Sequence, residues 1–152
     1  PEGYGNYYAW GETTTKSTNT SSNYNYSSNP TTLPLDRDAA YTNWGNSWRM
    51  PTKAEQDELR TECTWTWTTQ NGVNGYMVTS KTNGNSIFLP YAGNKQYDQS
   101  NNVGEAGYYW SKSSDDMDYR TFAYKLYMNV GTVEVSESSG CIGYSVRAVL
   151  PK

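Results

Sequence analysis

Few residues in this chain could do chemistry, and the missing residue types exclude more reactions than the present ones suggest. The 152 residues include no histidine and two cysteines, Cys63 and Cys141. Without an imidazole, Ser-His-Asp and Cys-His nucleophile systems cannot be assembled, and two thiols cannot complete a tetrahedral zinc site. One disulfide is possible, but the spacing does not require it, and we favour two separate thiols. The sequence therefore predicts a protein that is not an enzyme and that binds no cofactor or metal.

One acidic cluster is the place where a hard cation could bind. Asp115, Asp116 and Asp118 lie close together in the sequence. Their carboxylates could supply part of a Ca²⁺ site, which needs about six to eight oxygen ligands. The alternative is a solvated loop between two strands, and we favour it because charge runs are usually exposed to solvent.

The composition favours one folded domain over a disordered chain. Hydrophobic residues make up 35% of the chain and the mean hydropathy is -0.89, yet aromatic residues reach 15%. Disordered segments are poor in aromatics and rich in net charge, whereas the formal charge here is -3. Each Tyr or Trp can bury roughly 150–250 Å², so the 15 Tyr and 6 Trp can build a core. We expect residues 1–152 to form a single domain.

Charge and hydropathy exclude two classes of partner. The sequence pI of about 4.9 argues against nucleic-acid binding, which needs a stripe of Lys and Arg. No apolar run approaches the roughly 20 residues of a membrane-spanning helix, so we expect no direct membrane insertion. The chain begins at Pro1, which we interpret as the start of a trimmed mature domain. The lack of a signal peptide therefore carries no information about its compartment.

The first part of the chain predicts a long loop. Residues 13–32 are almost entirely Ser, Thr, Asn and Tyr, which favour turns over regular elements. We expect a surface excursion there, strand-like only around Tyr24 and Tyr26. Residues 7–10 (YYAW) indicate a short aromatic strand before it.

Two helices are predicted next. Residues 35–44 carry an acid near their start and are followed by Gly45, the usual start and stop signals of a helix. Residues 52–62 are the stronger case, because Thr52 and Glu55 have the spacing of a capping box, in which each side chain bonds the other residue's backbone amide.

From Trp65 onward the pattern is that of short antiparallel strands. Asn83-Gly84, a strong hairpin signal, joins two of them, and Gly131 permits a turn between two others. The strands are predicted at residues 76–79, 86–89, 108–111, 122–128, 132–135 and 144–150. Helices followed by a run of short strands are typical of an α+β protein.

Six short segments resemble known proteins. Residues 48–55 (WRMPTKAE) are similar to the W-R-L-P-T-x-A-E segment of formylglycine-generating-enzyme-type C-type-lectin-like domains. Residues 38–44 lie where those domains have their first helix, and residues 143–147 (GYSVR) resemble their closing G-F-x-V-R strand. The other three segments resemble paralogous domains of surface proteins from gut Bacteroides-like bacteria: residues 8–14, 84–90 and 107–111. Together the segments span nearly the whole chain in the expected order.

The resemblance implies a C-type-lectin-like fold, with two helices packed on a small twisted antiparallel sheet. It does not extend to formylglycine chemistry, because those oxidases need a pair of reactive cysteines in the C-terminal part, where Cys141 stands alone. It does not extend to calcium-dependent sugar binding either. The sequence has no Glu-Pro-Asn motif, and residues 44–46 are a poor match to Trp-Asn-Asp.

Residues 108–147 resemble the variable segment of the variable proteins of diversity-generating retroelements, which occur in such bacteria and their phages. The resemblance implies a ligand-binding face of changeable side chains on a constant scaffold. Ala123, Leu126, Met128 and Val133 are the scaffold-like positions. The expected ligand-binding residues are Asp115, Asp116, Asp118, Tyr119, Lys125, Tyr127, Asn129, Thr132, Glu134 and Ser136. Tyr119 and Tyr127 would be the anchors, although both are also ordinary residues for a half-buried strand.

The expected function is therefore ligand binding by a receptor or adhesin outside the cell or on its surface, or alternatively on a phage virion. Its partner would be a protein or a glycan. The alternative is a structural or assembly domain of a bacterial surface lipoprotein or pilus.

Several other residues have structural interpretations. We expect Arg49 and Arg147 to pair with carboxylates or cap carbonyls, and Glu12 to pair with a buried arginine. Large aromatics in a small domain are usually core residues. This expectation covers Trp44, Trp48, Trp65, Trp67 and Trp110.

Overall fold

The computed structural model describes residues 2–26, 30–45, 47–115 and 121–150. Its helices are α1 (Ala39–Trp44) and α2 (Lys53–Glu62), preceded by a short 3-10 helix at Leu35–Arg37. Its strands are β1 (Cys63–Gln70), β2 (Val73–Ser80), β3 (Ser86–Pro90), β4 (Asn94–Gln96), β5 (Gln99–Asn101), β6 (Gly107–Ser114), β7 (Phe122–Asn129) and β8 (Thr132–Ser139). The fold is α+β, as the order of helical and strand-like segments predicted.

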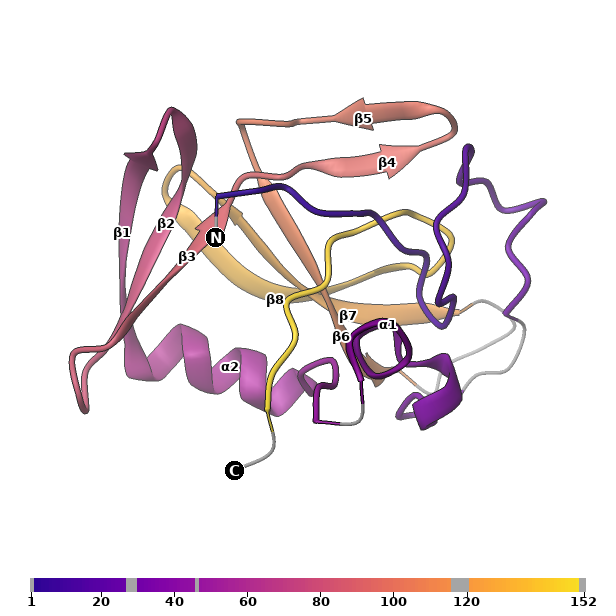
Figure 1. The fold of residues 1–152 in the computed structure, drawn as a ribbon, viewed down its shortest axis with the longest axis horizontal. Coiled ribbons are helices and arrows are strands. Elements are labelled where there is room, and N and C mark those ends of the chain that lie inside the picture. Colours follow the sequence, from indigo (N-terminus) through magenta and orange to yellow (C-terminus); the bar gives the residue numbers. More distant parts are fainter. Residues whose placement is uncertain (1, 27–29, 46, 116–120, 151–152) are drawn as a thin grey trace.

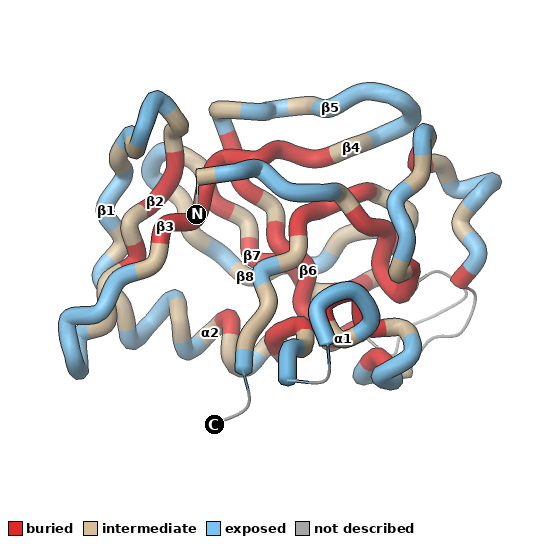
Figure 2. The backbone as a smooth tube through the Cα atoms, in the orientation of Figure 1, coloured by how far each residue is buried: buried red, intermediate tan, exposed pale blue. Residues whose placement is uncertain are grey.

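The strands form three antiparallel sheets, β1–β2–β3, β4–β5 and β6–β7–β8. Figure 1 shows β6–β7–β8 in the middle of the molecule, with α2 beneath it, β1–β2–β3 at one end and β4–β5 at the top. Helix α2 packs against all three central strands. In Figure 2 the buried backbone gathers in the middle, between these layers. No helix among the described residues is both long and apolar enough to span a membrane.

Two hydrophobic clusters lie on opposite faces of the central sheet. Trp110 and Ala123 belong to the first cluster, together with Trp10 from the N-terminal segment. Leu126 and Met128 belong to the second, against which Leu59 of α2 and Val135 of β8 pack. Side chains alternate between the faces of a strand, so the α2 side of the sheet is the side of the second cluster. On the other side, the N-terminal segment and α1 contribute to the first cluster. It includes Leu33, Ala39, Ala40 and Met50, and Ile142, Val146 and Ala148 pack against it.

Helix α2 begins as predicted. The Thr52 hydroxyl accepts a hydrogen bond from the Glu55 amide at 3.1 Å, and the Thr52 amide donates to the Glu55 carboxylate at 2.9 Å. Arg49 adds two parallel hydrogen bonds to the same carboxylate, at 2.7 and 2.8 Å. The guanidinium is the main cause that lowers the pKa of Glu55 to about 2, from 4.5. The prediction that Arg49 pairs with a carboxylate is confirmed.

The first helix is shorter than predicted, because Asp38 divides residues 35–44. Asp38 has extended backbone, so the 3-10 helix ends before it and α1 begins after it. Its fully buried carboxylate accepts hydrogen bonds from the amides of Ala40 and Tyr41 at 2.9 and 3.0 Å. The Met50 amide donates to both carboxylate oxygens, and Lys112 lies 3.9 Å away. One side chain thus caps α1 and ties it to the segment before α2.

The predicted hairpin between β2 and β3 is present, with Tyr76 opposite Leu89, but Asn83-Gly84 is not its two-residue turn. The connection runs over residues 81–85. The two-residue turn is Asn71-Gly72, which joins β1 to β2 with φ values of 49° and 80°. Both residues have positive φ, which type I′ turns require and which Asn-Gly tolerates. The strand β1 was not predicted as a separate element.

Five predicted strands are confirmed, and two are wrong. The confirmed segments lie inside β2, β3, β6, β7 and β8: residues 76–79, 86–89, 108–111, 122–128 and 132–135. Residues 7–10 form no strand; Tyr8 makes one isolated bridge, to Tyr144. Residues 144–150 also form no strand and make single bridges at Tyr144, Ser145 and Val149. Tyr8 has a single bridge and the bridge partners change along residues 144–150, so no ladder of hydrogen bonds develops.

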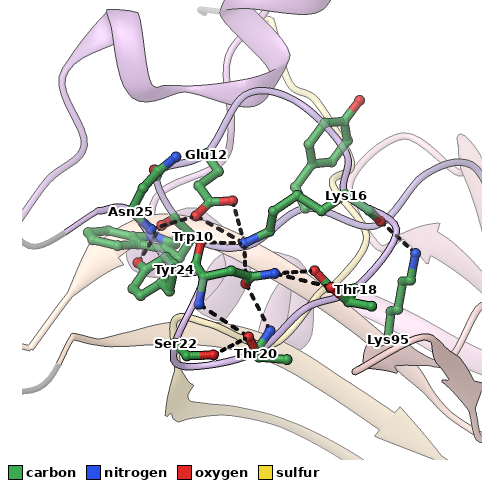
Figure 3. Close-up of polar contacts among 12 residues, drawn as sticks. Trp10, Glu12, Lys16, Thr18, Thr20, Ser22, Tyr24, Asn25 and Lys95 are labelled. Carbon is green, nitrogen blue, oxygen red and sulfur yellow. Dashed lines mark hydrogen bonds and ion pairs between the residues drawn. The ribbon is translucent and has the colours of Figure 1, made fainter.

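Of the excursion predicted at residues 13–32, residues 27–29 lie outside the described residues. Residues 13–26 form no helix or strand and are held by polar side chains (Figure 3). Lys16 pairs with the buried Glu12 at 2.9 Å and donates to the Asn23 side chain at 3.0 Å. The Asn23 side-chain amide donates to the Thr18 carbonyl at 2.8 Å. Tyr24 donates its hydroxyl to the Trp10 carbonyl at 2.5 Å, and no strand forms around Tyr24. Glu12 therefore pairs with a lysine, not with the predicted arginine.

The tryptophans do not all lie in the core. Trp110 is fully buried and Trp65 is partly buried, as expected. Trp44, Trp48 and Trp67 contradict the prediction, because 46%, 38% and 48% of their surface is exposed.

The two cysteines are free, in agreement with the separate thiols that we favoured.

Candidate ligand-binding site

Six of the ten residues predicted to bind a ligand lie on one face of β7 and β8. They are cross-strand partners in this hairpin: Lys125–Ser136, Tyr127–Glu134 and Asn129–Thr132. Directly opposed residues of an antiparallel pair point to the same side of the sheet. We call these six residues the display face. The scaffold-like residues Leu126, Met128 and Val133 occupy the alternate positions, on the α2 side.

The display face combines exposed and half-buried side chains. Glu134 is exposed, while Tyr127, Asn129, Thr132 and Ser136 are half-buried. Strand β8 lies at the edge of its sheet and has no strand partner on its outer side among the described residues. The side chains of β8 can therefore be approached both from the face and from the edge.

Lys125 differs from the rest of the display face, because it is 8% exposed. Its ammonium group donates to the Ser136 hydroxyl at 2.8 Å and to the Glu137 carbonyl at 3.2 Å. Burial lowers the pKa of Lys125, and the carboxylates of Glu134 and Glu137 act in the opposite direction. Lys125 lies on the display face, but its ammonium group is used for hydrogen bonds within the hairpin.

Tyr127, one of the two expected anchors, supplies the aromatic ring of the display face. The Asn129 side-chain amide donates to its hydroxyl at 2.8 Å, and burial is the main cause that raises its pKa. Its ring lies 5.1 Å from the ring of Tyr108, which in turn stacks on Tyr144 at 4.9 Å. Tyr108 is a residue of this surface that the sequence analysis missed. The pairing of β6 with β7 places Tyr108 opposite Tyr127, and this register could not be predicted from the sequence.

The predicted acidic cluster is described only in part. Asp115 follows β6, half-buried, and its amide donates to the Phe122 carbonyl at 3.3 Å. Asp116, Asp118 and Tyr119 lie outside the described residues. Burial, followed by a hydrogen bond and repulsion from Asp115, raises the pKa of Glu137. Asp115 thus lies toward Glu137, on the α2 side of β8, and the structure does not bring it together with the display face.

The chemistry of the display face is that of reversible polar contacts. Among the described residues, no group of three side chains of the metal-ligating types is close enough to hold an ion. The face offers hydroxyl, amide and carboxylate groups around one aromatic ring, and these suit hydrogen bonding to another molecule.

Comparison with protein-family models, with curated proteins and with solved structures found no match to this chain.

Proposed function

We propose that the chain is a non-enzymatic ligand-binding domain of the receptor or adhesin type, which presents the display face on a C-type-lectin-like scaffold. The observation that carries the proposal is the alternation along β7 and β8. Six residues expected to bind a ligand share one side of the hairpin, and the apolar residues between them pack toward α2. The side chains expected to face a ligand thus alternate along these strands with side chains that support the fold.

The side chains of the display face indicate the class of partner. Tyr127 supplies a rigid aromatic surface, while Asn129, Thr132 and Ser136 supply adaptable donors and acceptors, a mixture also used by antibody binding sites. Glu134 is exposed and adds negative charge, which favours basic or hydroxyl-rich surfaces. We therefore propose a protein or glycan ligand, met outside the cell, on its surface or from a phage virion.

Diversification of this face by a retroelement is part of the same proposal. Changes on the display face leave the α2 side of the sheet intact, because the backbone ladder of β7 and β8 is independent of side-chain identity. The proposal requires substitutions to be concentrated at the display face. Sequencing this gene in many cells of its source population tests it. Substitutions at Tyr127, Asn129 and Thr132, with none at Leu126 and Met128, would support diversification; an even distribution would overturn it.

The alternative, a structural or assembly domain, would use the free edge of β8. Strand edges can pair with another chain, and exposed charges on an edge oppose such pairing. Glu134 and Glu137 are both exposed on β8, so two copies of this edge would repel each other. The edge therefore favours recognition of a different surface over self-assembly.

Ligand binding is tested by probing a glycan array and an array of extracellular proteins with the purified chain. Any ligand found is then titrated against a double variant, Glu134→Ala with Ser136→Ala. We expect its affinity to fall at least about tenfold, as for loss of a few polar contacts. The matched control is Glu62→Ala with Thr64→Ala, at positions exposed at the junction of α2 and β1. Equal affinity of the two double variants would contradict the proposal.

A further inference from the structure

A cavity lies on the α2 side of the central sheet, between α2 and residues 147–150. Its volume is about 310 Å³, at the lower end of the range of small-molecule sites. The lining is mostly apolar and includes Leu59, Ile87, Leu89, Leu126 and Val149. None of these residues belongs to the display face, so this pocket is a separate feature of the molecule.

One residue that lines the pocket carries a buried acceptor without a partner. Gln56 lines it and is 3% exposed. Its side-chain amide donates to the Tyr109 carbonyl at 3.0 Å, which fixes the orientation of the group. Its Oε1 atom is buried and accepts no hydrogen bond within the described part of the chain. A buried polar atom left unpaired costs about 1–3 kcal/mol, and a ligand donor that reached this atom would relieve that cost.

Arg147 lies where this pocket meets two neighbouring hollows. It is exposed, and it lines all three of these cavities. Its guanidinium makes no ion pair with any residue that the structure describes. Glu55 also lines the pocket, but both of its oxygens already accept hydrogen bonds from Arg49. The mouth therefore holds an uncompensated positive charge.

Trp48 completes the mouth. It is 38% exposed and lines both the pocket and the open hollow beside it. A large, half-exposed aromatic ring next to a free guanidinium is suited to an aromatic or alkyl ligand that carries an anionic group.

We propose that this pocket binds a small aryl or alkyl carboxylate that also carries one hydrogen-bond donor. The apolar body lies against Leu59, Ile87 and Leu126, the donor meets the Gln56 side-chain oxygen, and the carboxylate pairs with Arg147. The small volume of the pocket and the positive charge at its mouth favour a compact acid over a polymer. The site is independent of the display face, so its failure would leave the proposed function untouched.

Three related probes test the proposal by isothermal titration calorimetry with the full chain. Indole-3-propionate has an apolar ring, an N–H donor and a carboxylate. Its 1-methyl derivative lacks the donor, and indole-3-propanol lacks the carboxylate. We expect the first to bind at least about fivefold more tightly than either of the others, because each lacks one charge-assisted or buried hydrogen bond. Equal binding of all three would overturn the proposal.

Two variants then locate the site. Arg147→Gln, at an exposed position, should weaken indole-3-propionate at least about tenfold and leave indole-3-propanol unaffected. Arg60→Gln, on the exposed side of α2, is the matched control and should change neither affinity. If Arg147→Gln and Arg60→Gln change the affinity for indole-3-propionate equally, its carboxylate does not bind at the mouth of this pocket.

The second variant, Gln56→Met, keeps the side-chain length and removes the acceptor. It should abolish the preference for indole-3-propionate over its 1-methyl derivative. If this variant fails to fold, Ile87→Phe, which fills the pocket from β3, should weaken all three probes. Unchanged binding to the folded pocket variant would overturn the proposal.

Discussion

Two regions of this molecule are built from the same kinds of residue and use them in opposite ways. The excursion at residues 13–26 and the display face are both rich in Ser, Thr, Asn and Tyr. In the excursion, Asn23 and Lys16 bond back to the loop itself. On the display face, Thr132 has no side-chain hydrogen bond within the described residues, and Glu134 makes one contact, of 3.5 Å, to Ser136.

The difference follows from where the backbone finds its hydrogen bonds. A loop has no ladder, so its buried amides and carbonyls need side-chain partners. In β7 and β8 the ladder satisfies the backbone. The side chains there bond one another, as Lys125 bonds Ser136 and Asn129 bonds Tyr127, or are left for other contacts. Composition is therefore a poor guide to function in a polar protein, because the same Asn or Tyr is structural in one place and displayed in the other.

The largest expected effect comes from comparing two glutamates. Glu12→Ala removes the buried partner of Lys16 and the acceptor of the Asn25 amide, and should lower the free energy of unfolding by about 3 kcal/mol. Glu134→Ala is the matched change on the display face and should shift it by less than about 0.5 kcal/mol. Urea denaturation measures both. Similar losses for the two variants would remove the distinction between the regions.

A pair of asparagines gives a smaller effect. Asn23→Ala removes hydrogen bonds to Lys16, Thr18 and Thr20, and should cost about 1 kcal/mol because the site is exposed. Asn129→Ala removes one bond to Tyr127, but it also removes a buried, unpaired oxygen. These two contributions oppose each other, so we expect almost no change for Asn129→Ala in the same denaturation experiment. A larger loss at Asn129 than at Asn23 would reverse the comparison.

The smallest expected effect is the contribution of Lys125 to the pH dependence of stability. Lys125 is the display-face residue whose ammonium group bonds within the hairpin. Burial lowers its pKa below the ordinary 10.5. Between the lowered pKa and 10.5 the unfolded chain binds more protons than the folded chain, so this group makes stability rise with pH. Lys125→Met removes the charge and should be relatively most stabilising near neutral pH, with its advantage shrinking toward pH 10. Urea denaturation of both proteins at several pH values measures this difference, and a constant difference would contradict it.

The parts of the fold that could be predicted from the sequence are those fixed by local interactions. The capping box of α2 needs only Thr52 and Glu55, and the alternation of β7 and β8 needs only the period of a strand. Asn83-Gly84 does lie between β2 and β3, but the connection runs over residues 81–85 and is longer than the predicted two-residue turn. A two-residue Asn-Gly turn occurs instead at residues 71–72, between β1 and β2.

The features that could not be predicted depend on distant segments. Tyr8 and Tyr144 form a single β-bridge although nearly the whole chain separates them in sequence. No local sequence pattern predicts a single bridge of this kind. The exposure of Trp44 and Trp48 depends on how residues 146–148 pass beside them. Likewise, the unpaired oxygen of Gln56 exists only because its amide is committed to Tyr109, on another element.

The buried carboxylate of Asp38 has a consequence for how the molecule opens. Because the amides of Ala40, Tyr41 and Met50 converge on this one group, helix α1 cannot fray without exposing the segment that leads into α2. A six-residue helix, which would be marginal by itself, is thereby bound to the cooperative unfolding of the whole domain. Hydrogen exchange at the Met50 amide should accordingly be among the slowest in the chain.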